Sequence, residues 1–76
     1  MISEQEIREG YRKRFNKDMS DSDYLAFLLF MKGCECYDAV SYEDAHEKIM
    51  ATFSLLIEAP LQEKKDRLHD IVLRMA

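Results

Sequence analysis

Apolar residues recur at helical spacing along most of the chain, and this pattern predicts four helices. The first spans about residues 4–16, the third about 42–57, and the fourth begins near Pro60. A long apolar segment between the first and third helices predicts the second. The expected core stripes contain Ile7, Tyr11 and Phe15 in the first helix, Ala45, Ile49, Phe53, Leu56 and Ile57 in the third, and Leu61, Leu68, Ile71, Val72 and Met75 in the fourth.

The expected helix starts carry capping signals. Ser3, Ser41 and either Ser20 or Ser22 can accept a hydrogen bond from the free N–H groups at a helix start. Proline is favoured in the first turn of a helix, which suits Pro60. These signals agree with the helices that the apolar spacing predicts.

Composition supports an all-α fold in a single domain, residues 1–76. Apolar residues make up 47% and charged residues 34% of the chain, which is typical of a globular protein. Glycine and proline total only three residues, and no strand pattern has a partner strand. We therefore expect a small four-helix bundle, or a compact helical array with short loops, whose core is thin. Because Gly10 weakens the first helix, we expect another helix to pass close to it.

The second helix has more apolar residues than one stripe can hold. The wheel side expected to face water contains Lys32, Glu35 and Asp38, together with Tyr24, Leu28 and Met31. The side expected in the core contains Leu25, Ala26, Leu29, Phe30, Gly33, Cys36, Tyr37 and Val40. Two small residues on the core side, Ala26 and Gly33, would let a neighbouring helix approach closely.

Two interpretations of this helix stay open. Its own chain could bury it on nearly every side, as the central helix of an unusual packing. Alternatively Tyr24, Leu28 and Met31 form an exposed patch that binds another protein or a second copy of the chain. Exposed apolar patches with a charged rim often mark such contacts. The exposed patch is therefore our functional hypothesis.

Charge is distributed unevenly along the chain, whose net charge is −4. Residues 8–17 hold five basic residues and one acid, and residues 18–47 hold eight acids and one lysine, which gives +4 and −7. The acidic residues can simply keep a small protein soluble. They can also dock a basic partner, such as a nucleic-acid-handling protein. The candidate acidic residues for that contact are Asp38, Glu43, Asp44 and Glu47.

The basic segment allows an alternative function, which is nucleic-acid binding. Its candidate residues are Arg8, Arg12, Lys13, Arg14 and Lys17. Such side chains can contact phosphates, but these five spread around the helix, and the neighbouring Tyr11 and Phe15 are expected in the core. The negative overall charge also argues against this function. In the other interpretation the basic segment pairs with the acidic stretch, within the molecule or across a dimer.

Candidate chemistry is sparse. Glu43 and His46 have the E-x-x-H spacing that carboxylate-bridged metal bundles use. Such a metal site needs a second copy of this motif, and the segment before His69 matches it poorly. We expect a half-buried His46 bonded to a carboxylate, and no metal or cofactor. Cys34 and Cys36 are expected on opposite sides of a helix, as reduced thiols that cannot pair.

Taken together, the sequence predicts a cytoplasmic, non-enzymatic protein-interaction module. It has no apolar run long enough to cross a bilayer and no signal-peptide pattern at its start. It also lacks a phosphate-binding loop and a nucleophile motif. A small regulator, inhibitor or adaptor fits these properties, and self-association as a homodimer is compatible with them.

Overall fold

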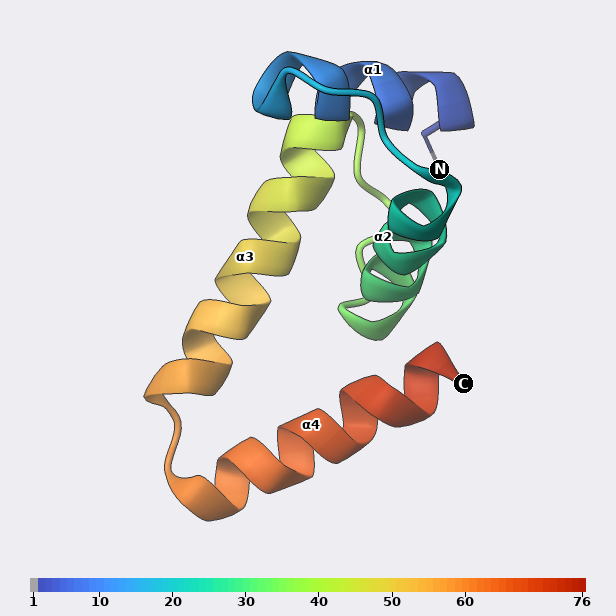
Figure 1. Cartoon of the computed structure of the whole chain (residues 1–76). Helices are drawn as coiled ribbons and strands as arrows, with labels where there is room; N and C mark the ends of the chain where they lie inside the picture. The colour runs from blue at the N-terminus through green and yellow to red at the C-terminus, as the bar shows by residue number, and fades with distance from the viewer. Residues whose placement is uncertain (1) are drawn as a thin grey trace.

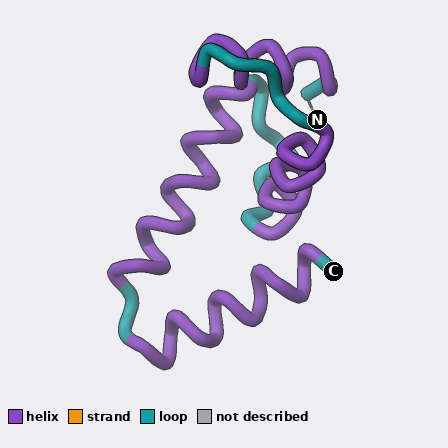
Figure 2. Tube along the Cα trace, viewed as in Figure 1, coloured by secondary structure: helices purple, strands orange, loops and turns teal. Residues whose placement is uncertain are grey.

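The computed structural model describes residues 2–76, which form four α-helices joined by short loops (Figure 1). The helices are α1 (Glu4–Phe15), α2 (Asp21–Gly33), α3 (Tyr42–Glu58) and α4 (Leu61–Met75). Within residues 2–76 the remaining chain is loop and turn, and there is no strand (Figure 2). The all-α prediction is confirmed.

Serine caps begin the first three helices. Ser3, Ser20 and Ser41 each accept a hydrogen bond from the backbone N–H three residues further on, at 3.1 to 3.2 Å. The structure therefore selects Ser20 over Ser22 as the cap of α2. At the other end of α1, Asn16 adopts a left-handed conformation with φ of 55°, a common way to end a helix.

The helices form an open frame and do not run side by side. α1 lies across the start of α3, and α4 returns from the far end of α3 toward the C-terminal end of α2 (Figure 1). The radius of gyration is 13.1 Å, whereas roughly 11 Å is usual for a globular chain of this length. A more open shape leaves more of each helix facing solvent.

Both glycines lie where two helices touch. A Cβ atom on Gly10 would lie 2.3 Å from the Cβ of Tyr42, at the start of α3. A Cβ atom on Gly33 would lie 2.9 Å from both Ile71 Cγ2 and Met75 Cγ of α4. The expected close approaches at Gly10 and Gly33 are confirmed.

The core lies mainly between α1, α2 and the first half of α3. The rings of Phe27 and Tyr42 stack there with their centroids 5.1 Å apart. α4 contributes one buried residue, Ile71. The buried apolar residues are Ile2, Ile7, Met19, Phe27, Met31, Cys36, Ala39, Tyr42, Ala45, Ile49, Leu56 and Ile71.

The buried side of α2 is the one that we expected to face solvent. Met31 is 0% exposed and Phe27, one turn before it, is also buried. Tyr24 and Leu28 are partly buried and pack against the same cluster. The prediction of an exposed patch at Tyr24, Leu28 and Met31 is therefore wrong.

The opposite side of α2 is largely open. Leu25, Leu29 and Phe30 were expected in the core, and all three are exposed. Part of the error lies in the length of the helix, which ends at Gly33. Tyr37 and Val40, which we had placed on the same helical side, lie in the following loop and are exposed too.

The stripes of the other helices are only partly covered. The core assignments of Ile7, Ala45, Ile49, Leu56 and Ile71 are confirmed, whereas Tyr11, Phe53 and Met75 are half-buried. Five residues expected in the core are exposed, because no neighbouring helix lies over them. They are Phe15, Ile57, Leu61, Leu68 and Val72.

Candidate functional site

An apolar groove runs between α1, α2 and the first half of α3. Apart from two tyrosines, the ionisable residues in its wall are Asp23 and His46. The apolar and aromatic residues that line it are Tyr11, Phe15, Met19, Ala26, Phe27, Phe30, Tyr42, Ile49 and Met50. Its floor is core, while Phe15, Phe30 and Met50 at its sides are exposed.

The apolar surface continues from this groove toward α4. Phe30 packs edge-on against Phe53 of α3, with ring centroids 5.8 Å apart. Ile57 follows Phe53 by one helical turn and is 72% exposed. Leu68 and Val72 of α4 are exposed on the same stripe as the buried Ile71.

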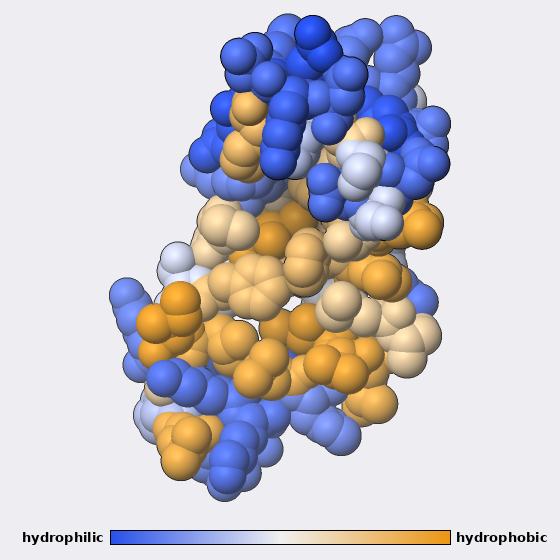
Figure 3. Space-filling view, viewed as in Figure 1, coloured by the Kyte–Doolittle hydropathy of each residue, from blue (hydrophilic) through white to orange (hydrophobic). Residues whose placement is uncertain are grey.

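Figure 3 shows hydrophobic atoms gathered across the middle of the molecule, around a hollow framed by the helices. We name this surface the open apolar face. It comprises Phe15, Phe30, Met50, Ile57, Leu68 and Val72.

α2 also borders a second hollow on its outer side. It is lined by Leu25, Leu28, Leu29, Lys32 and Tyr37, and little of its surface is polar. α2 therefore borders two hollows, and its own chain covers the side that contains Phe27 and Met31 and the C-terminal end at Gly33, where α4 packs.

His46 borders the open apolar face from α3. Burial is the main cause that lowers its pKa, and the positive charge of Arg14 lowers it further, against a smaller opposing effect of Glu43. Its ring lies against that of Tyr42, with centroids 5.9 Å apart. His46 is half-buried as expected, but among residues 2–76 no carboxylate bonds to it, so that part of the expectation is wrong.

Three of the four candidate acidic residues are engaged within the molecule. Lys48 Nζ lies 3.2 Å from Asp38 and 3.6 Å from Asp44. The hydrogen bond and the charge of Lys48 lower the pKa of Asp38. Glu43 pairs with Arg14 at 2.8 Å. These contacts leave less of the acidic stretch available to a basic partner.

Glu47 is the fourth candidate acidic residue, and it lies beside the open apolar face. It is exposed and lines a shallow hollow together with His46 and Met50 of that same edge of α3. Its carboxylate therefore adds negative charge to the rim of the face.

The basic segment is paired largely within the molecule. Arg8 donates to Asp21 at 2.8 Å and Arg12 donates to Asp18. The guanidinium of Arg8 also lies over the ring of Tyr24, 4.9 Å from its centroid. With the Arg14–Glu43 pair, these contacts confirm the interpretation in which basic and acidic segments pair within the molecule.

Lys13 and Lys17, the other two candidates for nucleic-acid binding, are exposed. The other three candidates, Arg8, Arg12 and Arg14, already have carboxylate partners within the molecule. The structure brings no uninterrupted basic surface together along the described part of α1.

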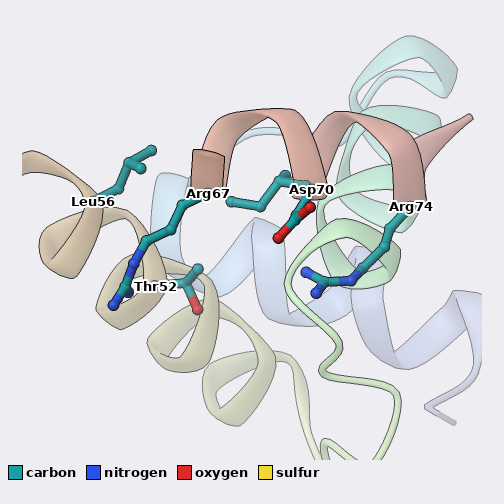
Figure 4. A pocket seen from close by; sticks show the side chains of 6 residues that line it. Thr52, Leu56, Arg67, Asp70 and Arg74 are labelled. Atoms are coloured by element: carbon teal, nitrogen blue, oxygen red, sulfur yellow. The ribbon is translucent and has the colours of Figure 1, made fainter. Parts of the chain in front are cut away.

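A pocket between α3 and α4 contains two arginines. Asp70 lies between Arg67 and Arg74, and Thr52 faces them from α3 (Figure 4). Arg67 pairs with Glu63 at 2.7 Å, and Arg74 pairs with Glu35 at 3.0 Å. Because nearby carboxylates offset both cations, the pocket is not arranged to hold an anion.

The two thiols lie in the loop after α2, so their expected placement on a helix is wrong. Cys34 ends the helix and Glu35 between them has a positive φ of 53°. Cys36 is buried, and its Sγ lies 3.5 Å from the carbonyl oxygen of Met31. Burial is the main cause that raises the pKa of both thiols, which makes them weak nucleophiles.

Within residues 2–76 no group of three His, Cys, Asp or Glu side chains is placed to hold a metal ion. None of the described helices has the length and apolar character required to cross a bilayer. Comparison of the chain with protein-family models, with curated proteins and with solved structures found no match.

Sequence reasoning missed the residues of the open apolar face because it assigned all but Met50 to the core. The usable signal was the excess of apolar residues over the surface that four short helices can cover. The same excess exists on α3 and α4, where Leu55 and Leu73 fall on the polar sides of their helices.

Proposed function

We propose that the protein is a non-enzymatic protein-interaction domain that binds through the open apolar face. The observation that supports this proposal most directly is the exposure of six large apolar side chains from all four helices, together with the hydrophobic surface that Figure 3 shows across the middle of the molecule. Soluble monomers rarely expose a larger apolar patch, and patches of this kind commonly bind other proteins.

The extent of the face is consistent with a protein contact. Its six side chains are 38% to 72% exposed. At about 200 Å² for a large side chain, they expose roughly 600 Å² of mostly apolar surface. Each partner in a standard protein interface contributes about 800 Å², including a polar rim.

The exposed apolar stripe of α4 supports the same function. Helices in small proteins gain most of their stability from tertiary packing of an apolar stripe. α4 buries one residue of its stripe, Ile71, and leaves Leu61, Leu68 and Val72 exposed. A partner on the open apolar face would cover Leu68 and Val72 and hold α4 in place.

The test uses a matched pair of substitutions on α3. Ile57 is 72% exposed on the open apolar face, and Leu55 is 58% exposed about 160° around the same helix. Immobilised wild type is expected to capture a defined protein, or a second copy of the chain, from an extract of the native cell. Ile57→Glu should lose that protein and Leu55→Glu should keep it.

The purified partner then gives the quantitative test by calorimetry. Ile57→Glu is expected to weaken binding at least about tenfold, because the interface would bury an unpaired charge. Circular dichroism checks that both variants keep the wild-type helix content. Equal binding by wild type and Ile57→Glu, to every partner found, would contradict the proposed function.

A further inference from the structure

We propose that the occupant of the open apolar face is a second copy of this chain, related by a two-fold axis. This inference rests on the proposed function and names the partner. In the dimer, α4 of each copy lies along the groove between α1, α2 and α3 of the other. The two copies thereby cover each other's exposed stripes.

A two-fold interface must be self-complementary, since the same surface occurs on both sides. The open apolar face meets this condition. One end of it is the groove lined by Phe15, Phe30 and Met50, and the other end is the stripe of α4 with Leu68 and Val72. In an antiparallel pair, the α4 stripe of each copy lies against the groove of the other copy.

Charge at the two ends of the face favours this arrangement. Asp23 lines the groove, and Glu47 lies beside Met50 at its edge. Lys65 is exposed on α4 on the same helical side as Leu68 and Val72. The antiparallel arrangement therefore brings a lysine of one copy to the carboxylates of the other, whereas a parallel pair would bring like charges together.

The first experiment compares two neighbouring residues of α4 by sedimentation equilibrium. Val72 and Leu73 are 58% and 59% exposed, and they point about 100° apart on the helix. We expect wild type to be a dimer. Val72→Glu should raise the dimer dissociation constant at least about tenfold, and Leu73→Glu should leave it within about twofold.

The second experiment reverses charges at the rim. Lys65→Glu or Glu47→Lys alone should raise the dimer dissociation constant severalfold, because each places like charges opposite one another. The combined variant exchanges the two signs and should restore the wild-type value. Failure of the combined variant to recover would overturn the antiparallel arrangement.

Two outcomes would overturn the inference as a whole. One is a wild-type monomer across the accessible concentration range, and the other is a dimer that Val72→Glu leaves unchanged. If Val72→Glu lowers the helix content, Ile57→Glu with Leu55→Glu as its control takes its place. A wild-type monomer that still captures a different protein through Ile57 would leave the proposed function intact and exclude only self-association.

Discussion

Residues of one type occupy very different surroundings in this small protein. Met31 is fully enclosed while Met50 is half-exposed, and Phe27 is buried three residues before the exposed Phe30. In each pair the more buried residue belongs to the core cluster between α1, α2 and α3. Residue type alone therefore did not indicate which apolar side chains belong to the core.

His46 gives a prediction at the scale of one residue. Burial and Arg14 lower its pKa in the folded protein below the ordinary value of 6.5, so the unfolded chain binds a proton at higher pH than the folded one. The free energy of unfolding should therefore fall as pH drops below about 6.5, and should not depend on His46 above that range.

Urea unfolding of wild type and His46→Gln between pH 5 and 8 measures this contribution. The carboxylates contribute equally to the pH dependence of stability in both proteins. The difference between the two proteins therefore isolates the contribution of His46. We expect the fall in stability toward pH 5 to be smaller in His46→Gln. Identical pH dependence in the two proteins would show that His46 is not shielded from solvent as described.

Helix positions were well predicted from sequence, because caps and spacing are local signals. Ser3 and Ser41 begin their helices as expected, and the stripe residues Ile7, Ala45 and Ile49 are buried. Such signals need no knowledge of how the helices are arranged.

The orientation of α2 was not predictable in the same way. This helix is apolar around most of its circumference, so spacing favours no single face. Phe27 lies next to Met31 on the wheel, and with Tyr24 and Leu28 these residues form a second apolar side. Which side is buried depends on where α1, α3 and α4 lie, and that is decided by contacts such as those at Gly10 and Gly33.

The junction of α1 and α3 gives a prediction at the scale of elements. Gly10→Ala should lower the free energy of unfolding by about 1–2 kcal/mol, since forced overpacking outweighs the gain in helix propensity. The reason is that the new Cβ would lie 2.3 Å from Tyr42 Cβ, a contact that only a shift of the helices can relieve.

Glu9→Ala is the control for Gly10→Ala. Glu9 is exposed on the same helix, and alanine there should change stability by no more than about 0.5 kcal/mol. Thermal unfolding of the three proteins supplies the comparison. Stabilisation by Gly10→Ala would mean that α1 and α3 do not approach as closely as described.

At the scale of the whole molecule, the open frame explains why so many apolar residues remain exposed. A chain of 76 residues has few helices with which to cover its own core. Here α4 packs against α2 around Gly33 and against the end of α3, and a hollow remains between the helices (Figure 3). A second copy on the open apolar face would complete the missing layer.

The most direct test of this account is residue-level footprinting with a small labelling reagent at several protein concentrations. Labelling of Met31 should be absent throughout. Ile57 and Val72 should be labelled in dilute protein and protected as the concentration rises, while Leu55 and Leu73 stay labelled. Strong labelling of Met31, or labelling of Ile57 and Val72 that never changes with concentration, would contradict the account.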